Sequence, residues 1–145
     1  MDKVESVLSS FRDGFSCAQA LLSAYGPELG LDRETALKVA GAFGGGMGRM
    51  GEACGAVTGA IMVIGLRYGS TDPKDFRAKE EAYRLVRAFA ERFRALNGSI
   101  ICKELLGCDI GTPEGMKIAR ESKVFGTRCP KYVKDAAEII EELLR

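Results

Sequence analysis

The sequence predicts an all-α fold, a single-domain compact bundle of roughly six to eight helices. Two observations predict it. Ala, Leu, Glu, Lys and Arg dominate the composition and favour helices, whereas β-branched runs with a period of two residues are missing. Residues that start and stop helices also recur along the chain. The 145 residues make one domain, 1–145, which is long enough to bury a core without disulfides.

Helix signals are clear in the first part of the chain. An opening amphipathic helix is expected over residues 2–11. Ser16 and Gln19 form the pattern of a capping box and start the next helix, and Asp32 caps a third. A glycine-rich turn then leads into a central helix of small residues over 54–69.

The second part of the chain carries similar signals. Asp72 followed by Pro73 predicts the N-cap and first residue of a long helix. Ser99 is expected to cap a short helix, a further helix starts near Pro113, and Cys129 is the expected N-cap of the last one. The apolar stripe predicted for the long helix consists of Phe76, Tyr83, Val86, Ala90 and Phe93.

Composition narrows the function classes. Lys and Arg number 21 against 20 Asp and Glu, a net charge of +1, so we expect no nucleic-acid binding. The longest apolar run, Ala60 to Leu66, is too short to span a bilayer, and we expect no direct membrane insertion. The amphipathic N-terminus does not resemble a secretory signal. We therefore expect a cytoplasmic protein.

Five cysteines and no histidine are the unusual feature of the composition. The missing histidine removes Cys/His zinc sites, His-ligated haem and Cys–His nucleophile pairs. Adjacent carboxylates such as Glu80 and Glu81 diverge by about 100° on a helix, which argues against a hydrolase. Any chemistry must therefore use thiols or an added cofactor.

Four of the five cysteines fall within the first turn of a predicted helix. Unpaired N–H groups and the helix dipole stabilise a thiolate there and lower the thiol pKa. If the four helix starts converge, they form one electropositive site. The candidate catalytic and metal-binding residues are Cys17, Cys54, Cys102 and Cys129. Cys108 follows Gly107, which ends a helix, and lacks this environment. The ordinary alternative is that these cysteines are small buried hydrophobes.

The glycine run and nearby arginines have competing interpretations. Gly46 to Gly51 matches G-x-G-x-x-G, but a predicted helix precedes it instead of a strand, so close packing is favoured over phosphate binding. Arg49 and Arg67 flank the Cys54 segment, and Arg128 precedes Cys129. Near the thiols these arginines would lower the thiol pKa and could receive an anionic substrate. Solvated side chains are the ordinary alternative.

The cysteine pattern resembles the C_GCAxxG_C_C family of redox-active proteins, which has four characteristic cysteines. Its Cys-Gly-Ala-x-x-Gly motif reads Cys54-Gly55-Ala56-Val57-Thr58-Gly59 in this chain, and the other three candidate cysteines match the remaining positions. The resemblance covers about residues 14–145. It implies a redox function at the four cysteines, and Gly55 and Gly59 are the candidate cofactor-binding residues. Cys108 has no place in the pattern.

Two functional hypotheses stay open at this point. In the first, the four cysteines ligate an iron–sulfur cluster or zinc, or they cycle between dithiol and disulfide with an electron-transfer or thiol partner and no cofactor. In the second, the chain is a non-catalytic helical interaction module, which could be a homo-oligomer such as a homodimer, and its cysteines are structural. The sequence does not decide whether the protein is an enzyme.

Overall fold

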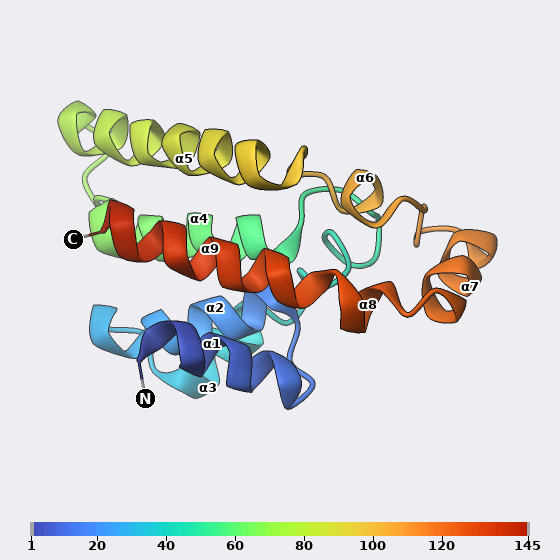
Figure 1. The fold of residues 1–145 in the computed structure, drawn as a ribbon. Helices are drawn as coiled ribbons and strands as arrows, with labels where there is room; N and C mark the ends of the chain where they lie inside the picture. Colours follow the sequence, from blue (N-terminus) through green and yellow to red (C-terminus); the bar gives the residue numbers. More distant parts are fainter. Residues whose placement is uncertain (1, 145) are drawn as a thin grey trace.

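Residues 2–144 are described by a computed structural model, and they form helices joined by turns (Figure 1). The β-pairing within this range is one isolated antiparallel bridge between Ala53 and Ile101. The predicted all-α fold is confirmed. None of the helices within residues 2–144 combines the length and the apolar character needed to cross a membrane.

In the described part of the chain, seven α-helices have seven or more residues, and α6 and α8 are single turns. The helices are α1 (Lys3–Arg12), α2 (Cys17–Tyr25), α3 (Arg33–Val39), α4 (Gly55–Tyr68), α5 (Phe76–Asn97), α6 (Cys102–Leu106), α7 (Pro113–Glu121), α8 (Val124–Thr127) and α9 (Cys129–Leu143), with a 3₁₀ turn η1 (Pro27–Leu29) after α2.

The helices α4 and α9 occupy the middle of the molecule, with α5 on one side and α1, α2 and α3 on the other (Figure 1). The short helices α6, α7 and α8 lie together at one end. The core between these layers is apolar, and its fully buried side chains include Leu21, Val63, Phe89 and Val133. This packing places the starts of α4 and α9 at the same end as α6.

Close contact between α2 and α4 depends on glycine. Both Gly55 and Gly59 are buried in α4. A Cβ added at Gly55 would lie 3.0 Å from the backbone nitrogen of Ala18, and one added at Gly59 would lie 3.0 Å from its Cα. Such contacts are tighter than real Cβ atoms normally make, so the two helices approach each other only because these residues lack a side chain.

The long helix α5 begins later than predicted. Asp72 is not its N-cap, because the Asp72 carboxylate accepts a hydrogen bond from Lys74 N (2.9 Å) and its carbonyl accepts one from Asp75 N (3.0 Å). These bonds close a separate turn that contains Pro73. Asp75 is the cap, and its carboxylate accepts from Ala78 N at 3.0 Å.

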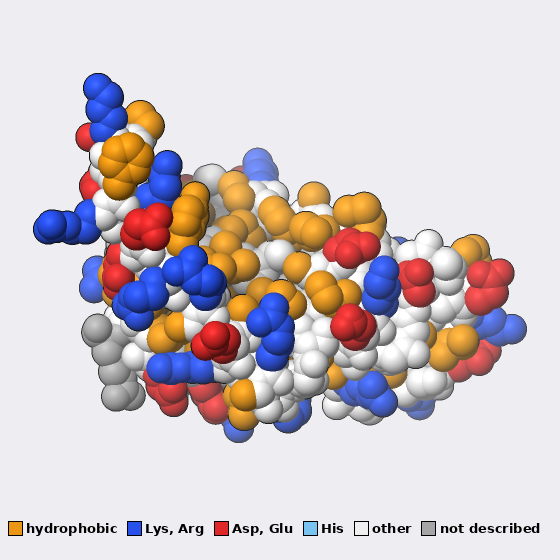
Figure 2. Space-filling model, turned by 90° about the horizontal axis from the view of Figure 1, so that it is seen from above, with side chains coloured by type: hydrophobic (Ala, Val, Ile, Leu, Met, Phe, Trp, Pro, Cys, Tyr) orange, Lys and Arg blue, Asp and Glu red, His pale blue; other side chains and the backbone are white. Residues whose placement is uncertain are grey.

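The predicted apolar stripe of α5 is only partly buried. Of its five residues Phe93 is in the core, and Val86 and Ala90 are partly buried. Phe89, which the prediction left out, is also in the core, and its ring stacks on that of Phe93 with centroids 5.9 Å apart. Phe76 and Tyr83 are instead exposed, at 67% and 52%. Figure 2 views this side of the molecule and shows hydrophobic side chains gathered among charged ones.

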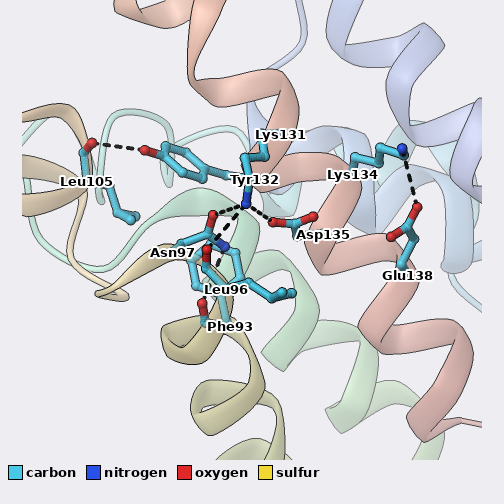
Figure 3. A network of polar contacts seen from close by, with 9 residues as sticks. All are labelled: Phe93, Leu96, Asn97, Leu105, Lys131, Tyr132, Lys134, Asp135 and Glu138. Carbon is cyan, nitrogen blue, oxygen red and sulfur yellow. Dashed lines mark hydrogen bonds and ion pairs between the residues drawn. The ribbon is translucent and has the colours of Figure 1, made fainter.

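Lys131 ties the end of α5 to the start of α9 (Figure 3). Its ammonium group donates to Asn97 Oδ1 at 2.7 Å and to the Leu96 carbonyl at 3.4 Å, and it pairs with Asp135 at 2.6 Å. A cation is favourable at the C-terminal end of a helix, where carbonyl groups lack partners. This contact holds the first turn of α9, and with it Cys129, in register with α5.

Candidate functional site

One cavity of about 720 Å³ brings together the four cysteines that the sequence singled out. Cys54 and Cys102 are buried, while Cys17 and Cys129 are partly exposed. Each comes from the start of a different helix, namely α2, α4, α6 and α9. Cys108 is not among the residues that line the cavity; its Sγ contacts the Leu106 carbonyl at 3.8 Å.

Cys17 and Cys54 lie at the helix starts that the sequence predicted. Cys17 is the first residue of α2, directly after Ser16. The capping box is confirmed, because Gln19 N donates to Ser16 Oγ (3.3 Å) and Ser16 N donates to Gln19 Oε1 (3.0 Å). Cys54 is the N-cap of α4, and its carbonyl accepts from Val57 N and Thr58 N.

The local caps predicted for the other two cysteines are wrong, although both residues lie in first turns. Ile101, not Ser99, is the N-cap of α6, and Ser99 Oγ accepts from Ile101 N at 2.9 Å. Arg128, not Cys129, precedes α9, and Cys129 is its first residue. Cys102 N donates to the Glu52 carbonyl at 2.6 Å, so the entry to α6 is held by the segment before Cys54.

The glycine run forms a left-handed turn that lines the cavity. Five consecutive residues, 45–49, have φ between 61° and 69°. Met47 and Arg49 adopt this conformation although they carry side chains, at a cost of roughly 1–2 kcal/mol each. A Cβ on Gly46 would lie 2.7 Å from Cβ of Cys102, so glycine allows the turn to pack against that residue. The sequence predicted a glycine-rich turn here, but its left-handed conformation was not predicted, since such a conformation has no apolar periodicity.

The thiol pKa values differ strongly within the cavity. The pKa of Cys54 is lowered, mainly because the Cys17 thiol hydrogen-bonds to its sulfur, with a further contribution from the N–H groups of Ala56 and Val57. The pKa of Cys17 is raised well above the ordinary value by its hydrogen bonds to Cys129 and Cys54 and by burial. Burial raises the pKa of Cys102 to about 12.

The expectation that every helix start lowers the pKa of its thiol is therefore right for Cys54 and wrong for Cys17 and Cys102. Burial can raise a thiol pKa by about 3–5 units. A helix dipole contributes about 0.3–1 kcal/mol, which is less than one pKa unit. Burial wins at Cys102, whose helix has only five residues.

Arginine lines the cavity at two positions, Arg49 and Arg120. Of the three arginines considered from the sequence, only Arg49 is there. Arg67 lies in the last turn of α4, at the end opposite to Cys54. Arg128 Nη1 donates at 3.0 Å to the Leu105 carbonyl. The same carbonyl accepts from Tyr132 Oη at 2.9 Å, as Figure 3 shows. Arg120 is far from every candidate cysteine except Cys129 along the chain, so no sequence signal marked it.

The candidate cofactor residues Gly55 and Gly59 have the packing contacts described above. Gly55 also lines the cavity and Gly59 does not. Within residues 2–144, no group of three or more Cys, Asp or Glu side chains is arranged to hold a metal ion. The four cysteines nevertheless line one cavity.

Fold and site together define an all-α protein whose thiols, at four helix starts, face a common cavity. Among protein families, the model described as "Putative redox-active protein (C_GCAxxG_C_C)" matches residues 15–143, and the chain belongs to this family. The resemblance inferred from the cysteine motif is thereby confirmed over nearly the whole chain. Comparisons with curated proteins and with solved structures found no match.

Proposed function

We propose that the protein is a thiol–disulfide redox protein in which Cys54 is the nucleophile and Cys17 is its resolving partner. The observation that carries this proposal is that Cys17 and Cys54 line one cavity at the starts of two closely packed helices, where a Cβ added at Gly55, next to Cys54, would lie 3.1 Å from Cβ of Cys17. The opposed pKa shifts of Cys17 and Cys54 support it, because a thiolate beside a protonated thiol is the reactive form of a dithiol. The family description as redox-active agrees with it.

The proposed reaction transfers two electrons from the dithiol to a disulfide substrate. The Cys54 thiolate attacks one substrate sulfur, the substrate S–S bond breaks, and the second substrate sulfur leaves as a thiolate. Cys17 then gives up its proton and attacks the Cys54 sulfur. The Cys17–Cys54 disulfide forms, and the first substrate thiol leaves with that proton. A dithiol from an electron-donor partner returns the protein to the reduced state, which suits a reducing, cytoplasmic compartment.

The other two cysteines have supporting roles in this proposal. Cys129 lines the same cavity and helps to raise the pKa of Cys17, which keeps Cys17 protonated until it attacks. Cys102 is buried and its pKa is about 12, so it stays protonated at neutral pH and is a poor nucleophile.

The test is a reaction of the reduced protein with hydroxyethyl disulfide, followed by mass spectrometry of the peptides. We expect one Cys17–Cys54 disulfide per chain and release of two thiols. Cys54→Ser should abolish the reaction, and Cys17→Ser should stop it at a mixed disulfide on Cys54. Cys108→Ser is the matched control and should react like the wild type. Normal reactivity of Cys54→Ser would end the proposal.

A metal-bound protein is the second candidate, favoured by the presence of four potential thiolate ligands on one cavity wall. It requires the sulfurs to take up a metal-binding arrangement, which residues 2–144 do not have in the structure described above. Metal analysis of anaerobically purified protein separates the candidates. Iron or zinc at about one site per chain, lost in Cys54→Ser and kept in Cys108→Ser, supports the metal; metal-free protein with reactive thiols supports the dithiol.

A non-catalytic interaction module is the third candidate, and the exposed side chains of Phe76 and Tyr83, which lie on one face of α5, favour it. Light scattering tests whether this face joins two copies. A dimer that dissociates in Tyr83→Glu, combined with thiols that do not react with disulfides, would support the module over the dithiol.

A further inference from the structure

We infer that the cavity takes a small disulfide compound that carries negative charge, and that Arg49 and Arg120 bind its anionic groups. This inference rests on the proposed dithiol function and specifies its substrate class. It is argued from the charge, the depth and the size of the cavity.

The charged residues that line the cavity have one sign. Arg49 and Arg120 line it, and no Asp or Glu within residues 2–144 does. Neither arginine forms an ion pair or a side-chain hydrogen bond within the described chain, unlike Arg84 and Arg92, which pair with glutamates at 2.7 and 2.9 Å. In a chain with 20 acidic residues, a cavity with two unpaired cations and no carboxylate favours an anion.

The arginine charges and the nucleophilic thiol lie at different depths in the cavity. Arg49 and Arg120 are exposed residues, so their charges lie toward the mouth. The nucleophile Cys54 is only 5% exposed. A substrate whose S–S bond reaches Cys54 can therefore leave its charged end nearer the mouth, where the guanidinium groups lie. Guanidinium groups recognise carboxylates through paired N–H donors, which gives the anionic end of such a substrate a defined position.

The depth of Cys54 also favours a small compound over a disulfide on a folded protein. A volume of about 720 Å³ falls in the range of about 300–1,000 Å³ typical of small-molecule sites. The wall is largely apolar beyond the arginines, with Phe11, Leu106 and Phe125 among its members, and these suit the carbon chain next to a disulfide.

The arginines would reverse the preference that a free thiolate in water has for cationic over anionic disulfides. In water, a thiolate reacts slowly with a dianionic disulfide because like charges repel, and it reacts faster with a cationic one. Two arginines near the mouth attract the dianion and stabilise the negative charge of the thiolate that leaves. In the first step, the Cys54–substrate S–S bond forms, the substrate S–S bond breaks, and the leaving sulfur carries the electron pair.

A matched series of disulfides tests the inference. Dithiodipropionate, hydroxyethyl disulfide and cystamine share a two-carbon chain and are dianionic, neutral and dicationic. We expect the second-order rate constant to fall in that order, with the dianion on the order of tenfold faster than the neutral compound. The advantage should shrink between about 0.05 M and about 0.5 M salt. Equal rates, or the reverse order, would overturn the inference.

Substitutions of the arginines test whether these residues cause the faster reaction with the dianionic disulfide. The double substitution R49Q/R120Q should remove the dianion advantage, and R120Q alone, on the surface of α7, should reduce it several-fold even if the double variant folds poorly. R67Q, at the far end of α4, is the matched control and should retain it. An advantage that survives in R49Q/R120Q, or in R120Q if the double variant does not fold, would assign the charge preference elsewhere and contradict the inference.

Failure of the inference and failure of the proposed function are distinguishable. If Cys54 reacts with the neutral disulfide and shows no charge preference, the dithiol function stands and the substrate class is wrong. If the wild type reacts with none of the three compounds, or reacts equally well as Cys54→Ser, both are wrong.

Discussion

At the scale of single residues, the neighbours of a thiol matter more than its position on a helix. Cys17, Cys54 and Cys102 all lie at helix starts, yet only Cys54 has a lowered pKa. The difference arises because Cys54 accepts a hydrogen bond from a protonated thiol, whereas Cys102 is buried without such a donor. A dithiol site therefore needs a second cysteine that stays protonated, and Cys17 meets this need.

Removing the donor should raise the pKa of Cys54. In Cys17→Ala, the sulfur of Cys54 loses its principal hydrogen bond while burial stays in place, so the thiolate is less stable. The rate of alkylation of Cys54 by iodoacetamide, followed by peptide mass spectrometry, should show a midpoint at higher pH than in the wild type.

The control for this measurement is Cys108→Ser, which removes a thiol outside the cavity and should leave the Cys54 midpoint unchanged. A Cys54 midpoint that is the same in Cys17→Ala and in the wild type would show that the helix start alone sets the pKa.

At the scale of elements, the sequence predicts a helix start well where a single candidate cap side chain can accept a hydrogen bond from a backbone N–H of the first turn. Ser16 and Asp32 are caps as expected. Asp72 and Ser99 are not caps. Each accepts a hydrogen bond from the backbone N–H two residues later, in a turn that precedes the helix, and which nearby residue becomes the cap depends on how the chain packs. The left-handed turn at 45–49 is beyond such rules, since it is stabilised by contacts with Cys102 and by hydrogen bonds across the turn.

Two glycines of α4 should respond oppositely to the same substitution. Gly59→Ala places a Cβ 3.0 Å from Cα of Ala18 and 3.1 Å from Cβ of Leu21, so α2 and α4 must move apart. We expect a loss of about 1–2 kcal/mol in the free energy of unfolding. A Cβ at Gly65 has no heavy atom within 4 Å, and Gly65→Ala should raise stability by up to about 1 kcal/mol through helix propensity.

Urea unfolding followed by circular dichroism measures both variants under the same conditions. If Gly59→Ala were as stable as Gly65→Ala, the contact between α2 and α4 would be looser than the structure has it. The reactivity of Cys54 in Gly59→Ala is a second measure, because a displaced α2 carries Cys17 away from Cys54.

At the scale of the whole molecule, the site exists because helices distant in sequence begin at the same end of the bundle. The sequence identified the four cysteines through their helix starts and family motif, and the structure places all four around one cavity. It did not identify Arg120 or the depth of Cys54, because both depend on tertiary packing. The Leu105 carbonyl, which accepts from Arg128 and Tyr132, shows the same point: it joins α6 to α9 across 27 residues.

Burial of thiols also links the whole fold to pH. Because the pKa of Cys102 is raised to about 12, the folded protein keeps this proton above the ordinary thiol pKa of about 8.5, while the unfolded chain loses it. The stabilisation from Cys102 is complete below about pH 8.5 and falls as pH rises toward about 12, by about 1.4 kcal/mol per pH unit. Cys17 acts in the same direction. Cys54 acts in the opposite direction, and its contribution is complete above about pH 8.5.

The slope of the free energy of unfolding against pH, compared between the wild type and a Cys102 variant, therefore isolates the contribution of Cys102. In metal-free, reduced protein, the free energy of unfolding of the wild type should fall by about 1.4 kcal/mol more than that of Cys102→Ala between about pH 7.5 and about pH 9.5. The two proteins share every other titratable group, so the contributions of those groups largely cancel in the comparison. Urea unfolding at the two pH values measures the difference. Parallel losses in the two proteins would mean that Cys102 is accessible to water in the folded state, and that the cavity is open to solvent down to its buried wall.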